Sequence, residues 1–376
     1  MVSVYTIFVL SLHIMATQAL PPLSQPKIDP SRPALAQALD NPRWGNLALI
    51  GGILFAAVFT FLIWALGDRL AAFVKPADQG PAWYYWQLAE PSTLTRLVAW
   101  GSYALHQLVS WGLIYYAQTR VKTYTKGLHP VNLVALGFNA LMIAWHVAQS
   151  QLTYDGLAQD TSIFASQGSV IIMLVWILVM ENRRRGMFFG KRLPIGKSII
   201  DAARRYHGYI FSWAVVFTFW YHPAENSQGH LIGFFYMFLL MLQGSLFLTR
   251  LHVNRWWMIV QEVVVLIHAA LVAVQQMTSD ITTGIWPMFF FGFAVIFIVT
   301  QLYGLGLKRW QTRAITAAFV VGTIVFYGVR GFDQLNEIIR IPAVEYLAAV
   351  VLALLIGAVV GIGRLGRRFA RLQTET

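Results

Sequence analysis

The sequence predicts an all-α integral membrane protein, a polytopic bundle of about ten transmembrane helices with both termini in the cytoplasm. Of the 376 residues, 57% are hydrophobic and only 12% are charged, whereas a soluble domain has about 25% charged residues. The apolar residues form about ten runs, each long enough to cross a bilayer. The basic residues collect on alternate connections between those runs, as they do in membrane proteins.

Apolar runs of about 17–25 residues predict the individual transmembrane helices. We place them at residues 46–67, 97–118, 131–151, 165–181, 206–221, 231–249, 256–275, 285–306, 314–329 and 343–363. Their hydrophobicity is nearly all-round, as expected of helices in lipid. The predicted transmembrane domain therefore covers residues 46–363. It lies between an N-terminal tail, 1–45, and a basic cytoplasmic C-terminal tail, 364–376.

The distribution of Lys and Arg predicts the orientation of these helices. If both termini are inside, all but five of the 28 basic residues lie on the inner side. The outer side keeps Arg69, Lys75, Arg96, Arg330 and Arg340. Such a separation is the positive-inside pattern. The formal charge of +12 is thus explained by topology and contact with anionic lipid, and we expect no binding of nucleic acid. The pattern suits a bacterial inner membrane or a thylakoid membrane.

The role of residues 1–20 in the predicted topology has several explanations. They are apolar enough for a signal peptide but lack a basic start. A cleaved signal would also place the mature N-terminus outside, against the charge pattern. An eleventh span and a misassigned start, with Met15 as the initiator, are the alternatives. We favour the misassigned start, followed by a Pro-rich polar tail.

Several chemistries are excluded or disfavoured by what the sequence lacks. There is no cysteine, which excludes disulfides, thiolate metal sites and Cys nucleophiles. The nucleotide-binding, zinc-protease and serine-hydrolase motifs GxxxxGK[ST], HExxH and GxSxG do not occur. Histidine boxes typical of di-iron enzymes are missing as well.

The histidines form the most suggestive pattern. Using a rise of about 1.5 Å per residue, we place His106 roughly 14 Å, His146 roughly 8 Å and His268 roughly 10 Å below the outer surface. His222 and His230 close the fifth predicted span and open the sixth. Five imidazoles are therefore expected in one outer layer, where ionisable residues are a functional hypothesis by default.

Imidazoles in such a layer can bind haem iron or a divalent metal, or they can relay protons. We consider His106, His146 and His268 as candidate ligands of a cofactor such as haem b, and His222 and His230 as candidate metal ligands. Polar residues at the same rim could orient them through second-shell hydrogen bonds or form the mouth of a cation path: Asp155, Asp160, Glu225 and Asn226. Ordinary interhelical hydrogen bonds are the plainer alternative for every one of these histidines.

Glu262 is a second unusual residue, because it lies inside the predicted seventh span. One interpretation pairs it with Arg250 or Arg255 near the inner surface. The other makes Glu262 and His268 successive stations of a proton path. The long outer loop, residues 69–95, carries the aromatic cluster Trp83–Trp86. We favour an interfacial helix there over a lid above the histidines.

Three groups of functions stay open at this point, and the third contains two alternatives. The first is a haem- or metal-binding oxidoreductase or electron-transfer protein, with a quinone as a candidate partner. The second is a proton-coupled transporter or channel. The third is a lipid- or acyl-modifying enzyme, or an assembly factor that binds another membrane protein through the Trp-rich loop.

Overall fold

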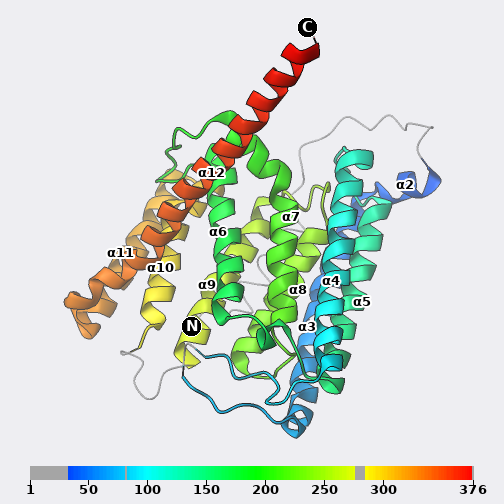
Figure 1. Ribbon diagram of the computed structural model, residues 1–376. Helices are drawn as coiled ribbons and strands as arrows, with labels where there is room; N and C mark the ends of the chain where they lie inside the picture. The colour runs from blue at the N-terminus through cyan, green and yellow to red at the C-terminus, as the bar shows by residue number, and fades with distance from the viewer. Residues whose placement is uncertain (1–32, 81–82, 276–283, 375–376) are drawn as a thin grey trace.

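The computed structural model describes residues 33–80, 83–275 and 284–374, and this part of the chain is built from helices with no β-strand. Ten long helices stand side by side (Figure 1). Their bounds are α3 Pro42–Leu66, α4 Thr93–Tyr116, α5 Pro130–Leu152, α6 Ile163–Arg185, α7 Lys197–Tyr221, α8 Gln228–Ser245, α9 Arg255–Gln275, α10 Trp286–Val299, α11 Arg309–Arg330 and α12 Glu337–Thr374. The short helix α2, Ala34–Leu39, precedes them.

Seven of these helices are long and apolar enough to cross a membrane: α3, α5, α6, α9, α10, α11 and α12. The prediction of a membrane helix bundle is therefore supported. Each of the ten predicted spans overlaps one long helix, but α4, α7 and α8 are less apolar or shorter. The count of ten spans and the side on which the termini lie stay predictions. Residues 1–20 and the loop at 276–283 lie outside the described residues.

The helix ends follow local chemistry. Asn41 caps α3 by accepting a hydrogen bond from the backbone of Arg43, with Pro42 in the first turn. Ser92 and Thr95 form a capping box at α4. Such side chains satisfy N–H groups that the first turn leaves unpaired. Gly186, with φ of +74°, ends α6 in a conformation that a residue with a side chain rarely adopts.

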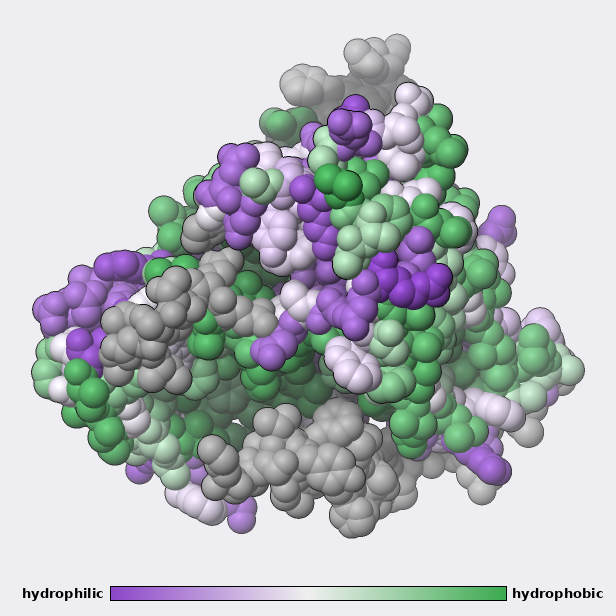
Figure 2. All heavy atoms as spheres, turned by 90° about the horizontal axis from the view of Figure 1, so that it is seen from below, coloured by the Kyte–Doolittle hydropathy of each residue, from purple (hydrophilic) through white to green (hydrophobic). Residues whose placement is uncertain are grey.

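Packing arranges the bundle around α7 and α8. Helix α7 contacts α4 and α6, whereas α8 contacts α3, α5 and α9. Helices α10 and α12 pack on each other at the opposite side of the bundle from α3–α5 (Figure 1). Figure 2 views the bundle from below. Hydrophilic side chains lie across the middle and along the left edge of this face, and hydrophobic ones cover much of its right and lower parts.

A buried ion pair joins α6 to α9. The Nη1 atom of Arg185 donates to both carboxylate oxygens of Glu262, at 2.9 and 2.8 Å. The two side chains are 2% and 11% exposed. The expectation that Arg250 or Arg255 pairs with Glu262 is therefore wrong. Sequence distance misled it, because Arg185 comes from a helix 77 residues earlier.

The long loop at residues 69–95 also differs from prediction. After the short helix η1, Gly67–Ala72, the described residues up to Pro91 contain no α-helix. The expectation of an interfacial helix at Trp83–Trp86 is wrong for the described residues. Tyr84 is buried instead, with its ring 5.3 Å from that of Tyr221 and 5.1 Å from that of His222. The loop lies against the end of α7 as an irregular cover.

We expect Arg185→Ala to destabilise the protein strongly, because it leaves the buried carboxylate of Glu262 without a partner. Breaking one side of a buried pair costs about 3–5 kcal/mol. Arg183→Ala is the control, since Arg183 lies 3.8 Å from Asp201 with both side chains near half exposed, and such pairs contribute about 1 kcal/mol or less. Unfolding of both variants in one detergent measures the difference. Equal losses would contradict the assignment.

Candidate functional site

The site is built on the α7–α8 turn, residues 222–227, which two side chains of α5 hold in place. The Nε2 atom of His146 donates to the backbone oxygen of His222 at 2.8 Å. The hydroxyl oxygen of Ser150 accepts from the backbone N–H of Ala224, also at 2.8 Å. These bonds satisfy backbone groups that a turn leaves unpaired. The turn is therefore fixed to a neighbouring helix.

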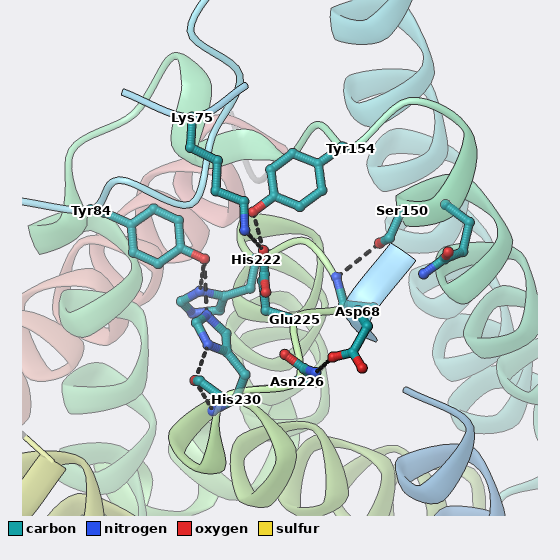
Figure 3. Close-up of polar contacts among 12 residues, drawn as sticks. Asp68, Lys75, Tyr84, Ser150, Tyr154, His222, Glu225, Asn226 and His230 are labelled. Atoms are coloured by element: carbon teal, nitrogen blue, oxygen red, sulfur yellow. Dashed lines mark hydrogen bonds and ion pairs between the residues drawn. The ribbon is translucent and has the colours of Figure 1, made fainter. Parts of the chain in front are cut away.

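A chain of hydrogen bonds runs across this turn through the hydroxyl of Tyr84 (Figure 3). The Tyr84 oxygen lies 2.8 Å from Nδ1 of His222 and 3.1 Å from Nε2 of His230. The other ring nitrogen of His230 lies 2.7 Å from the hydroxyl of Ser227. The centres of the two imidazoles are 5.3 Å apart. Four side chains therefore form one continuous series of exchangeable protons.

The protonation states of this chain follow from burial. Burial raises the pKa of the Tyr84 phenol well above its ordinary value. Burial, and then the imidazoles of His230, His268 and His146, lower the pKa of His222 well below its ordinary value. Tyr84 thus keeps its proton and His222 is neutral at neutral pH.

The single proton of Tyr84 gives the chain two equivalent polarities. If Tyr84 donates to His222, then Nε2 of His230 carries a hydrogen and donates to Tyr84, and Nδ1 of His230 accepts from Ser227. If Tyr84 donates to His230, every bond is reversed. A neutral imidazole donates at one ring nitrogen and accepts at the other, so both arrangements keep all three hydrogen bonds of the series. Switching between the two is the elementary movement of a proton relay.

A second group of contacts lies beside this series at Glu225. Its Oε1 atom accepts hydrogen bonds from Nζ of Lys75 and from the hydroxyl of Tyr154 (Figure 3). The Lys75 ammonium also lies 4.9 Å from the centre of the Tyr154 ring. Burial, and then the charge of Glu225, raise the pKa of Tyr154. The carboxylate is compensated by a cation and a neutral phenol, so this group ties the outer loop to the turn.

The two histidines predicted as a first pair share one aromatic wall of α7. His106 is fully buried, with its Nε2 atom 2.8 Å from Oδ1 of Asn139 and its Nδ1 atom accepting from Nε1 of Trp220 at 3.1 Å. The ring of His146 lies 4.6 Å from that of Trp220 and 4.4 Å from that of Phe219.

The contacts of His106 do not fit axial ligation of haem. An axial imidazole needs a free nitrogen that faces the iron. Both ring nitrogens of His106 are engaged by protein groups. His146 uses Nε2 to bond the turn, and its buried Nδ1 atom has no hydrogen bond to any described residue. Haem ligation by these two residues stays a prediction that no contact supports.

His268 on α9 joins the histidines of the turn. It is close enough to His222 to affect the charge of that imidazole. Its Nε2 atom faces Gly233 of α8, where an added Cβ would lie 3.0 Å away. Glycine is needed at position 233 for the two helices to approach. Four predicted histidines, from α5, α8, α9 and the turn, are thus neighbours.

The predicted rim residues do not orient these histidines. Asp160 accepts from Nε1 of Trp100 and pairs with Arg96, which joins it to α4. Asp155 is buried and accepts from the backbone of Gly156. Asn226 donates to Asp68 at 3.4 Å. Together with Glu225, none of them bonds a histidine side chain within the described part of the chain. They hold connecting segments in place.

The described residues around His222 and His230 do not form a group of metal ligands. Among the residues that the structure describes, no three His, Asp or Glu side chains gather at metal-binding spacing. His222 and His230 converge, but on the Tyr84 oxygen. A divalent metal at His222 and His230 stays a prediction.

Tyr84 and Ser227 are the functional residues that sequence analysis missed. Tyr84 lies in the run Trp83–Trp86, which looks like an ordinary interfacial belt. Ser227 has a weak signal, because it caps α8 and accepts from the backbone of His230. A cap with histidine three residues later could have indicated this bond.

Stability should fall as the pH drops below about 6.5, the ordinary pKa of histidine. A pKa depressed by folding means that the unfolded chain takes up the proton first, so stability present above 6.5 is lost on acidification. We expect His222→Asn to lower the pH dependence of the melting temperature between about pH 7.5 and about pH 5. Melting in one lipid–detergent mixture measures both slopes. The same slope in both proteins would contradict the buried, neutral state of His222.

Comparisons with known proteins return no matching family model, no matching curated protein and no matching solved structure. No function can be carried over from a relative. Function must therefore be argued from the geometry and chemistry of the site itself.

Proposed function

We propose that the protein is a proton-coupled transporter or channel whose outer proton-exchange site is the series Ser227, His230, Tyr84 and His222. One observation carries the proposal: the Tyr84 hydroxyl lies within hydrogen-bond distance of a ring nitrogen of both histidines. A series that can be polarised either way accepts a proton at one end and releases one at the other. Imidazole is the group best suited to this at physiological pH.

The path would continue from the turn along α9. His268 neighbours His222, and Glu262 lies six residues earlier on the same helix. Six residues are about 9 Å of helix. Glu262 is held by Arg185 at the other end of this interval. The predicted proton stations Glu262 and His268 would therefore be separate steps with other groups between them.

The membrane setting is part of the proposal. We infer ten spans with both termini in the cytoplasm, because each long helix coincides with a predicted span and the basic residues alternate. A lipid bilayer would surround the bundle, in a bacterial inner membrane or a thylakoid membrane. A quinone or a membrane-protein partner belongs to the alternative interpretations and gains no support from these contacts.

Tyr84→Phe tests the proposal, because it removes the shared hydroxyl and keeps the ring. We expect proton flux into proteoliposomes under an imposed potential to fall about tenfold or more. Losing one buried partner costs about 1–3 kcal/mol, and 1.4 kcal/mol is a factor of about ten.

Tyr85→Phe is the matched control. Tyr85 is the next residue and stacks on Trp86 with ring centres 4.1 Å apart. Its hydroxyl has no hydrogen bond to any residue that the structure describes. Flux should be unchanged in this variant, and melting should confirm that both variants fold. Equal flux in wild type, Tyr84→Phe and Tyr85→Phe would contradict the relay, and no flux in wild type would contradict transport.

A further inference from the structure

A second polar site lies inside the bundle, away from the α7–α8 turn. A small cavity of about 20 Å³ is enclosed by α6, α9, α10, η4 (Gln301–Gly304) and α12. Four polar side chains line it among aliphatic and aromatic ones: Arg185, Glu262, Gln301 and Glu345. About 10–15 Å³ suffices for one water molecule. The cavity is therefore polar and large enough for water.

Arg185 brings an unsatisfied donor to this cavity. Its Nη1 atom is engaged by both oxygens of Glu262. Its Nη2 atom is buried and has no hydrogen bond to any described residue. The side chain is only 2% exposed. A buried donor without a partner indicates that a small polar ligand, such as water, occupies the adjoining space.

Glu345 of α12 is the unpaired acid of the site. It is 5% exposed, and within the described part of the chain its carboxyl makes no ion pair and no hydrogen bond. Buried carboxylates are almost always paired. Glu345 is therefore the group whose charge is not explained by its protein neighbours.

Among the described residues that line the cavity, no Lys or Arg other than Arg185 is present. Helix α6 provides Arg185, which Glu262 of α9 already neutralises. Helix α10 contributes Phe293 and Ile296 to the cavity. On the side of α7, the cluster that includes α12 consists of aliphatic groups such as Ile199 and Ala203.

The charges of the cavity must balance. With all three groups ionised, Arg185, Glu262 and Glu345 sum to −1. An uncompensated buried charge costs several kcal/mol. A proton or a bound cation would remove this cost. Calcium and magnesium need about six or more oxygen ligands, and beyond the engaged Glu262 the cavity offers Glu345 and Gln301. A proton is the ligand that this site fits.

We propose that Glu345 is a proton-binding site on this water-sized cavity. The carboxylate takes up one proton from cavity water, an O–H bond forms, and the local charge goes from −1 to 0. Release is the reverse. This inference rests on the proposed function for the use made of the proton, and it adds a station on the cavity side of α9. Binding of the proton itself does not depend on transport.

Infrared difference spectra of the protein in lipid, recorded as the pH is raised, test the proposal. A buried protonated carboxyl gives a carbonyl band apart from the amide bands. We expect wild type to lose such a band on deprotonation and Glu345→Gln to lack it. Glu90→Gln, at an exposed loop position, is the control and should keep it. Because Gln has the shape and neutrality of a protonated carboxyl, Glu345→Gln should fold.

Glu345→Asp provides a second test if Glu345→Gln does not fold. The shorter side chain of Asp moves the carboxyl group, so the carbonyl band should shift. An unchanged band in either variant would overturn the proposal. Displacement of the wild-type band by NaCl at fixed pH, with KCl as the reference, would overturn it in favour of a sodium site. If the band behaves as expected but proteoliposomes show no flux, the proton site stands and the transport proposal fails.

Discussion

Most buried polar groups of a membrane helix bundle find their partners inside the protein, because hydrocarbon offers none. The architecture follows from that constraint. Asn132 of α5 donates to the backbone oxygens of Ser245 and Phe247 at the end of α8. At the other end of the same helix pair, His146 and Ser150 hold the α7–α8 turn. Polar contacts at both ends thus fix α5 against α8 and set where the histidines lie.

The polar groups around His222 and those around Glu262 differ in the kind of partner they have. Around His222, the partners are neutral groups that can each donate or accept, so protons can be rearranged without creating charge. The carboxylate of Glu262 is instead paired with the guanidinium of Arg185, so its partner carries a fixed charge. Glu345 belongs to neither arrangement. The proposed movement of protons along α9 would use the neutral series at one site and the ionic site at the other.

Much of the helical fold could be predicted, because span length and apolar composition are local properties of the chain. That His146 and His268 lie near the α7–α8 turn could be anticipated from the fixed helical rise, whereas their depth below a membrane surface stays a prediction. The partners could not. Tyr84 and Arg185 reach His222 and Glu262 from segments 138 and 77 residues away, and span patterns do not say which helices pack together. The loop before α4 was mispredicted. Its aromatic composition suggested contact with lipid, whereas these residues pack against the protein.

Solid-state nitrogen NMR of the histidine-labelled protein in bilayers tests the shared hydroxyl most directly. Each ring nitrogen reports whether it carries a hydrogen, and His222→Asn and His230→Asn assign the signals. The account predicts neutral imidazoles at neutral pH, with a hydrogen on only one of the two nitrogens that face Tyr84, Nδ1 of His222 and Nε2 of His230. Tyr84→Phe should disturb both signals. Two hydrogens facing Tyr84, or signals that ignore its removal, would contradict the account.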